Sequence, residues 1–498
     1  MSAPQLVEHE EPLTIERLLD PRRWIALAIV ATAQLMVALD ATIANIALPH
    51  AQAALGISDS DRAWVLTAYA LAFGGLLLLG GRIADYWGRK RTFLLGSLGF
   101  ALASALGGFA QDAGTLFAAR ALQGAFGALL APASLALLTV LFIEPRERAK
   151  AFGIYGAIAG GGAAVGLILG GVLTEYLDWR WCLLVNIPIA ILAGGLALKY
   201  VTESRAHGRT KYDVGGAVLV TLGLAGLVYG FTTAAEPDYG WGSSYTLSFI
   251  IVSLLFLAGF VIEELRAENP LLPLRIVLHR DRGGSMLASL LAGAGLFGSS
   301  LFMTYYFQQV LHYTPLHAGL ATLPITGGIL LAFPLATMLL TRVGAWPVMA
   351  TGAFVAAGGL LLFTRIGTTD HFWTDAFPAT LVFGAGLGML LIPMSNVALT
   401  GVNPRDAGAA GAVMNATQQI GGSLGAAALS SIALQAANSY LAEHWENMPA
   451  TIVEDTMVHS FRVGFAWAAA FLGVAGIVVL ALVRAGKIDT KNAPVHFG

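Results

Sequence analysis

Residues 24–46, WIALAIVATAQLMVALDATIANI, form a run of mostly apolar side chains that holds a single charge, Asp40. As a helix, this run is long enough to cross the roughly 30 Å hydrocarbon core of a bilayer. Thirteen further stretches of similar length and character follow along the 498 residues. The sequence therefore predicts an all-α polytopic membrane protein with fourteen transmembrane helices. This pattern is not that of a soluble enzyme.

The expected spans fall into a block of six, a pair and a second block of six. They lie near residues 24–46, 64–82, 92–110, 115–142, 151–173, 181–200, 214–234, 245–265, 284–307, 317–341, 346–364, 376–399, 407–434 and 463–484. We accordingly expect an N-terminal six-helix bundle over 1–203, a two-helix insert and linker over 204–270, and a C-terminal six-helix bundle over 271–498.

The two blocks of six share an ordered set of landmarks. Residues 127–134 (GALLAPAS) recur as residues 388–395 (GMLLIPMS). Each copy is followed by a Pro-Arg-acid turn, at 145–147 and 404–406, and then by a Gly-rich helix. Coincidence among small apolar residues is the alternative, but both the order and the orientation are preserved. Paired bundles of this kind usually hold a substrate site between them and rock about it.

Composition agrees with a membrane protein and argues against bound cofactors. Hydrophobic residues make up 56% of the chain and charged residues 12%. The net charge of −2 gives no reason to expect nucleic acid, and the single cysteine, Cys182, excludes an intramolecular disulfide and a cysteine-based metal site. The sequence lacks a nucleotide-binding Gly-x-x-x-x-Gly-Lys-Ser/Thr loop, so we expect no cofactor, no metal and no ATP hydrolysis.

The distribution of Lys and Arg predicts the orientation in the membrane. Most of the 28 basic residues lie at the termini and in alternate gaps between the spans, and Arg120 lies inside a span. By the positive-inside rule, both termini are expected in the cytoplasm. The opposite gaps hold only Arg62, Arg180, Arg365 and Arg462.

Three motifs identify a family. Residues 39–49 (LDATIANIALP) resemble the hallmark of the fourteen-span major facilitator transporters of the drug:proton antiporter-2 group. Residues 81–91 (GRIADYWGRKR) resemble the signature cytoplasmic loop of that superfamily, and residues 120–124 (RALQG) match a second family motif. The resemblance implies a major facilitator fold and proton-coupled export by alternating access.

Asp40 and Arg120 are the expected proton-coupling residues. A guanidinium in hydrocarbon is costly, so Arg120 should face a partner or a wet cavity. The two residues lie at similar depth, and in related transporters their helices are neighbours that line the central cavity. We therefore expect them to communicate directly or through water and to load or release one proton. A static ion pair that fixes two helices is the alternative.

The loop at residues 81–91 is expected to gate the conformational change. Gly88 permits a tight turn, while Arg89 and Arg91 complement the negative end of the preceding helix. The resemblance implies that Asp85 locks against a neighbouring helix N-terminus and a cation when the transporter faces outward, and Gly81 belongs to the same expected gating motif. An ordinary basic loop is the alternative.

Three glycines at four-residue spacing, Gly162, Gly166 and Gly170, predict a groove on one helix face where another backbone approaches closely. The pattern is similar to the antiporter motif of exporters, but Leu167 stands where that motif has proline. We assign these glycines to conformational gating. Generic packing is the alternative.

A mixture of aromatic, amide and thioether side chains is expected to bind the substrate, because it offers dispersion contacts without demanding one hydrogen-bond pattern. For each residue, packing is the alternative. The candidates are Asn45, Gln123, Phe302, Tyr305, Tyr306, Gln308, Met394, Asn396, Asn415 and Gln418.

The leading hypothesis is a proton-coupled exporter of hydrophobic or amphipathic drugs in a prokaryotic plasma membrane. Its expected partners are a hydrophobic small molecule, protons and the lipid bilayer, and a periplasmic adaptor is left open. A second hypothesis changes the cargo to an endogenous metabolite, antibiotic or lipid. A third, a membrane receptor or scaffold that transports nothing, is disfavoured because a passive bundle has little reason to keep buried charges.

Overall fold

The computed structural model describes residues 22–142, 144–205, 213–234, 236, 239–267, 270–272, 274–369, 371–400, 402, 407–444 and 451–485. Within these residues, fourteen helices are long and apolar enough to cross a membrane. The all-α fold with fourteen spans is therefore confirmed. The second Pro-Arg-acid turn, at residues 404–406, lies outside the described residues.

The helices follow the expected order along the chain. The first block comprises α2 (Arg22–Leu55), α3 (Trp64–Trp87), α4 (Arg89–Gly108), α5 (Ala113–Leu141), α6 (Pro145–Tyr176), α7 (Trp181–Leu184) and α8 (Asn186–Tyr200). Two helices follow, α9 (Val214–Thr233) and α10 (Ser244–Arg266). The remainder comprises α11 (Leu274–Val277), α12 (Arg280–Tyr305), the π-helix η1 (Tyr306–Val310), α13 (Pro315–Arg342), α14 (Ala345–Phe363), the π-helix η2 (Phe372–Ala376), α15 (Phe377–Leu399), α16 (Ala407–Glu443) and α17 (Ile452–Leu482).

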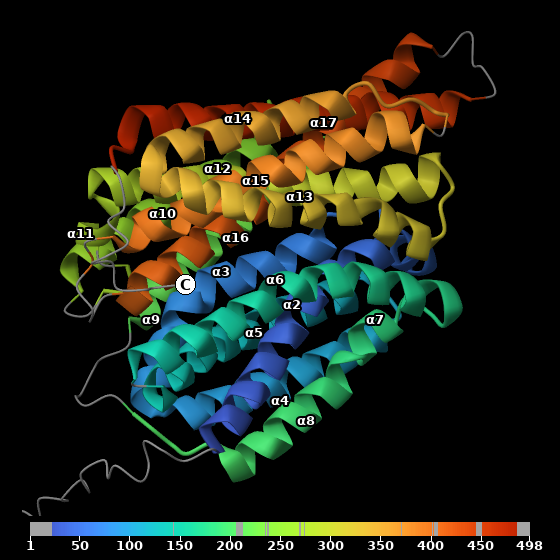
Figure 1. Ribbon diagram of the computed structural model, residues 1–498. Coiled ribbons are helices and arrows are strands. Elements are labelled where there is room, and N and C mark those ends of the chain that lie inside the picture. Colours follow the sequence, from blue (N-terminus) through green and yellow to red (C-terminus); the bar gives the residue numbers. More distant parts are fainter. Residues whose placement is uncertain are drawn as a thin grey trace, which may run out of the picture.

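The helices form two groups that lie side by side (Figure 1). One group holds α2 to α8, coloured blue to green, and the other holds α12 to α17, coloured yellow to red. The groups meet along two seams, where α3 packs on α16 and α6 packs on α13. Helix α9 packs on both α3 and α16, and α10 packs on α9. The division of the chain at residues 203 and 270 stays a prediction.

Several helix ends differ from those expected, because hydropathy marks the edge of the bilayer and not the end of a helix. Helix α2 was expected to end near residue 46 but continues through Pro49 to Leu55. The span at 181–200 is divided at Val185, because Pro188 has no N–H group to donate to the carbonyl of Leu184, four residues earlier. Much of the expected outer loop at 435–462 is helical, since α16 and α17 extend into it.

Candidate functional site

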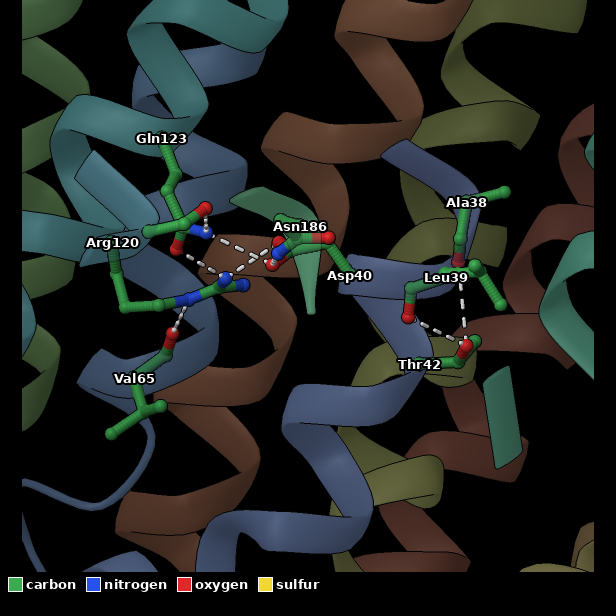
Figure 2. Close-up of polar contacts among 9 residues, drawn as sticks. Ala38, Leu39, Asp40, Thr42, Val65, Arg120, Gln123 and Asn186 are labelled. Carbon is green, nitrogen blue, oxygen red and sulfur yellow. Dashed lines mark hydrogen bonds and ion pairs between the residues drawn. The ribbon is translucent and has the colours of Figure 1, made fainter. Parts of the chain in front are cut away.

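Asp40 is held in a closed hydrogen-bond network in the interior of the first group. Arg120 Nη1 donates to its Oδ2 at 2.6 Å, while Gln123 Nε2 and Asn186 Nδ2 donate to its Oδ1 at 2.9 and 2.7 Å. These side chains come from α2, α5 and α8 and point toward one another (Figure 2). Asp40 is 0% exposed and Arg120 1% exposed, so the ion pair has no contact with solvent.

The guanidinium of Arg120 has further partners. Its Nε donates to the carbonyl of Val65 at 2.9 Å, its Nη1 also donates to Gln123 Oε1 at 2.8 Å, and its Cζ lies 4.6 Å from the centre of the Tyr69 ring. Breaking a buried ion pair by removing one partner typically costs about 3–5 kcal/mol, because the other charge stays buried without compensation. Protonation of Asp40 would create this imbalance, so the network can couple a proton to a rearrangement.

The sequence interpretation missed two members of this network. Neither Asn186 nor Ser104, which accepts a hydrogen bond from Gln123 at 2.8 Å, was among the predicted site residues. Both side chains are fully buried. A polar residue within an apolar span was the available signal for Asn186.

A small cavity of about 10 Å³ lies beside Arg120. Ala44, Val65, Leu116, Trp179 and Cys182 are among its lining residues. This space is close to the least that one water molecule needs. A drug-sized molecule therefore cannot reach Arg120 from this side in the observed conformation.

The glycine row of α6 packs closely against α2. A Cβ atom at Gly166 would overlap Thr42 Oγ1, and one at Gly170 would lie 3.1 Å from Ile43 Cα. Figure 2 shows Thr42 on the side of α2 turned away from the ion pair, where its hydroxyl donates to the carbonyls of Ala38 and Leu39. The row is therefore a close helix contact, and Gly162 continues it against Leu35 and Ala38.

Several contacts join the two groups at the end that the sequence assigns to the outside. Asn45 Nδ2 donates to Ser300 Oγ at 2.5 Å, and Gln308 Nε2 donates to the carbonyl of Ile46 at 2.9 Å. The hydroxyl of Tyr305 donates to Gln52 Oε1. We call these three cross-group hydrogen bonds the outer contact layer.

Neighbouring contacts strengthen this closure. The guanidinium of Arg62 lies 4.4 Å from the centre of the Tyr305 ring. The N–H of Leu316 donates to Glu175 Oε2 at 3.1 Å, and a Cβ atom at Gly171 would lie 2.5 Å from Leu316 Cα. The outer end of the α6–α13 seam is thus tightly packed.

The candidate substrate residues are divided among four places. Gln123 belongs to the Asp40 network, while Asn45, Tyr305 and Gln308 belong to the outer contact layer. Phe302 and Met394 are buried in packing, as is Tyr306, whose hydroxyl donates to the carbonyl of Gly367 at 3.1 Å. On α15 and α16, Asn396 and Gln418 are half-buried and Asn415 is exposed. The structure does not bring these residues together, and their contact with substrate stays a prediction.

The expected gating loop at residues 81–91 is mostly helical, because residues 81–87 end α3, residues 89–91 begin α4, and Gly88 alone joins the two helices. Gly88 has φ 130°, a conformation that favours glycine, and a Cβ atom there would lie 2.8 Å from the carboxylate of Glu203. Asp85 Oδ1, on α3, accepts from Arg89 Nη2, at the beginning of α4, at 3.1 Å. Gly81 lies near Pro132.

Glu203 has a capping role that the sequence did not reveal. Its carboxylate accepts hydrogen bonds from the backbone N–H groups of Lys90 and Arg91 at 3.1 and 3.2 Å, at the beginning of α4, and lies 3.7 Å from Arg91 Nε. A carboxylate in this position satisfies free N–H groups and complements the helix dipole.

Replacing Glu203 by Ala should lower the stability of the protein by about 1 kcal/mol, because two N–H groups at the beginning of α4 lose their acceptor. Thermal unfolding of the purified protein measures the effect. Glu144→Ala, which removes the corresponding cap at the beginning of α6, is the matched control for loss of an N-cap away from this loop. A midpoint unchanged by Glu203→Ala would contradict the capping role.

The chain is similar to known transporters over most of its length. The sequence profile of the Major Facilitator Superfamily matches residues 30–426. The puromycin resistance protein of Streptomyces alboniger is 48% identical, over 93% of this chain and 92% of its own. The cephamycin export protein of Amycolatopsis lactamdurans is 38% identical, over 81% and 84%. Among solved structures, an inward-facing bacterial homologue of the human lysosomal transporter Spinster covers 93% of this chain and 98% of its own, with a TM-score of 0.65 and 14% identity. It shows a shared fold.

Proposed function

The chain belongs to the Major Facilitator Superfamily, and from this premise we propose that it exports hydrophobic or amphipathic antibiotics in exchange for protons. The family is the one expected from the sequence motifs. Drug and antibiotic export is supported by relatives named for puromycin resistance, cephamycin export and tetracenomycin C export. The protein is a multi-pass membrane transporter and not an enzyme.

The observation that carries proton coupling is the buried pair of Asp40 and Arg120. In the ionised form, the carboxylate compensates Arg120 and accepts three hydrogen bonds. When Asp40 takes up a proton, Arg120 loses its compensating charge, and an arrangement that gives the guanidinium water or another partner becomes favourable. The proton therefore changes which conformation is more stable.

Helix α2 links this event to the outer contact layer. Asn45 and Ile46 follow Asp40 by five and six residues, about 8 Å along the helix axis. Both take part in hydrogen bonds to the second group. A shift of α2 caused by protonation of Asp40 would disturb these bonds and favour opening of the outer end.

The outer contact layer closes the outer end of the protein. This supports alternating access, with the present conformation facing the opposite side. We place that side, and both termini, in the cytoplasm on the basis of the Lys and Arg distribution. Asp85 pairs with Arg89 here, which agrees with an inner lock that engages only when the transporter faces outward. Gly81, Gly88 and Arg91, which lie at or near the junction of α3 and α4, belong to the same inner lock in the proposed cycle.

Everted membrane vesicles test this function with puromycin as the probe. A proton gradient, acidic inside, should drive puromycin into vesicles that contain the protein, and a protonophore should abolish accumulation. A proton moving across 100 mV supplies about 2.3 kcal/mol, enough for roughly fiftyfold accumulation of an uncharged solute. Accumulation that persists in the presence of protonophore would contradict proton coupling.

An antibiotic made by the same cell is a second candidate cargo. The cephamycin export protein and a probable actinorhodin transporter of Streptomyces coelicolor, 34% identical, favour it. Deletion of the gene would then cause a secondary metabolite to accumulate inside the cell. Unchanged intracellular metabolites would favour foreign drugs as the cargo.

A further inference from the structure

A cavity of about 400 Å³ lies between the inner halves of α2 and α6. Its volume is within the usual range for small-molecule sites, roughly 300–1,000 Å³. We call it the α2–α6 groove. Its lining residues are Trp24, Leu27, Ala28, Ala31, Thr32, Leu35, Ile154 and Ile158.

The sequence of α6 explains why the groove lies where it does. Ile154 and Ile158 lie on the same helix face as the glycine row, because all these positions are four residues apart. At Gly162 and beyond, the absence of side chains lets α2 approach α6 closely. At the two isoleucines, bulky side chains keep the helices apart, so a groove opens on the inner side of the row.

The lining is mostly apolar, and its side chains carry two polar groups, the Thr32 hydroxyl and the Trp24 indole N–H. The Thr32 hydroxyl donates to the carbonyl of Ala28 at 2.8 Å, and neither polar group carries a charge. Trp24 forms an aromatic wall that is held by Phe142, with the ring centroids 5.0 Å apart. Such a surface binds an apolar group by dispersion and by release of water.

The charges near the groove disfavour a cation. Lys150 Nζ lies 5.2 Å from the centre of the Trp24 ring, and the nearby Glu147 is paired with Arg23 at 2.8 Å. Across the six expected spans of each bundle, Asp40 is the only acidic residue, and it is buried in its own network. A positive charge moved into the groove would lose its hydration without gaining a carboxylate partner, which is strongly unfavourable.

We propose that the α2–α6 groove binds the apolar body of an uncharged amphipathic substrate and that lipophilic cations are poor cargo. This inference rests on the proposed export function and specifies its substrate class and a binding position. The sequence directed attention instead to a set of aromatic, amide and thioether residues, none of which lines this groove.

The test compares two dyes in everted vesicles, uncharged Nile red and the permanently cationic ethidium. The wild-type protein should accumulate Nile red with a preference of about tenfold or more over ethidium. Ala28→Phe, which fills the groove, should reduce Nile red accumulation by about tenfold. Ala258→Phe, the same substitution on an exposed face of α10, should leave accumulation unchanged.

A second pair of variants tests the charge argument. Ala28→Glu should raise the ethidium to Nile red ratio because it gives a cation a partner, whereas Ala28→Gln, of the same shape without charge, should not. Equal transport of both dyes by the wild type, or an unaffected Ala28→Phe, would overturn the proposal. So would phospholipid that co-purifies with the wild type and is lost from Ala28→Phe, since the groove would then be a lipid site.

Puromycin transport separates this proposal from the proposed function. If the wild type moves puromycin under a proton gradient while groove variants behave as wild type with Nile red, only the groove assignment fails. If neither puromycin nor either dye moves, the export function itself fails.

Discussion

Replacing Asp40 by Asn is expected to abolish proton-driven accumulation. Asn keeps the shape of the side chain but cannot exchange a proton, so the roughly fiftyfold accumulation that 100 mV could sustain should fall to about one. The single variant also leaves Arg120 buried without its partner charge, at a cost of about 3–5 kcal/mol. Everted-vesicle uptake and the thermal unfolding midpoint should therefore both decrease.

A double variant separates coupling from stability. Asp40→Asn combined with Arg120→Gln removes both charges, and replacing a buried pair as a whole is often neutral for stability. We expect the double variant to fold as the wild type does but to remain uncoupled. Proton-driven uptake by the double variant would show that the pair is only structural. Asp178→Asn is the matched control. It removes the charge of a partly exposed ion pair, in which Asp178 Oδ1 lies 3.7 Å from Arg180 Nη1, and should have little effect.

Replacing Gly166 by Ala is expected to impair closure of the outer end and to lower stability by about 1–3 kcal/mol, as overpacking usually does. The added methyl group would overlap Thr42 Oγ1 and lie 3.1 Å from the carbonyl oxygen of Leu39. Helices α2 and α6 must then move apart. Because α6 also packs on α13, this movement disturbs the packing of the two groups at the outer end. Uptake in vesicles and thermal unfolding should both report the change.

Two further variants make this prediction specific. Gly161→Ala adds the same methyl group to the same helix, where no atom of another helix lies within 4 Å, and should retain activity. Thr42→Ala removes the overlapping hydroxyl and should restore part of the activity of Gly166→Ala. Equal loss in Gly161→Ala and Gly166→Ala would mean that helix flexibility matters here and not the close contact.

The sequence predicted the parts of this structure that depend on local composition. Hydropathy located all fourteen spans, because transfer of an apolar segment into lipid depends on that segment alone. It did not locate the end of α2 at Leu55 or the break at Val185, which depend on packing and on backbone hydrogen bonds. The family motifs supplied the Asp40 and Arg120 candidates, and the structure places these two side chains in direct contact.

The remaining features depend on residues far apart in the chain. Asn186 follows Asp40 by 146 positions, and Glu203 caps a helix that begins at Arg89. No local sequence pattern could predict either of these contacts. Tyr305 and Gln308 were predicted to bind substrate because aromatic and amide groups can contact drugs. The same groups also form hydrogen bonds between helices, and both residues do so here. The α2–α6 groove also depends on such distant residues, since Trp24 lines it together with Ile154 and Ile158.

The position of α9 makes the two sides of the transporter unequal. By packing on both α3 and α16, it covers one of the two junctions between the helix groups. Among the helices that the structure describes, the α6–α13 junction has no comparable cover. A lipophilic compound that approached from the bilayer would therefore meet an uncovered junction between the two groups only at α6 and α13.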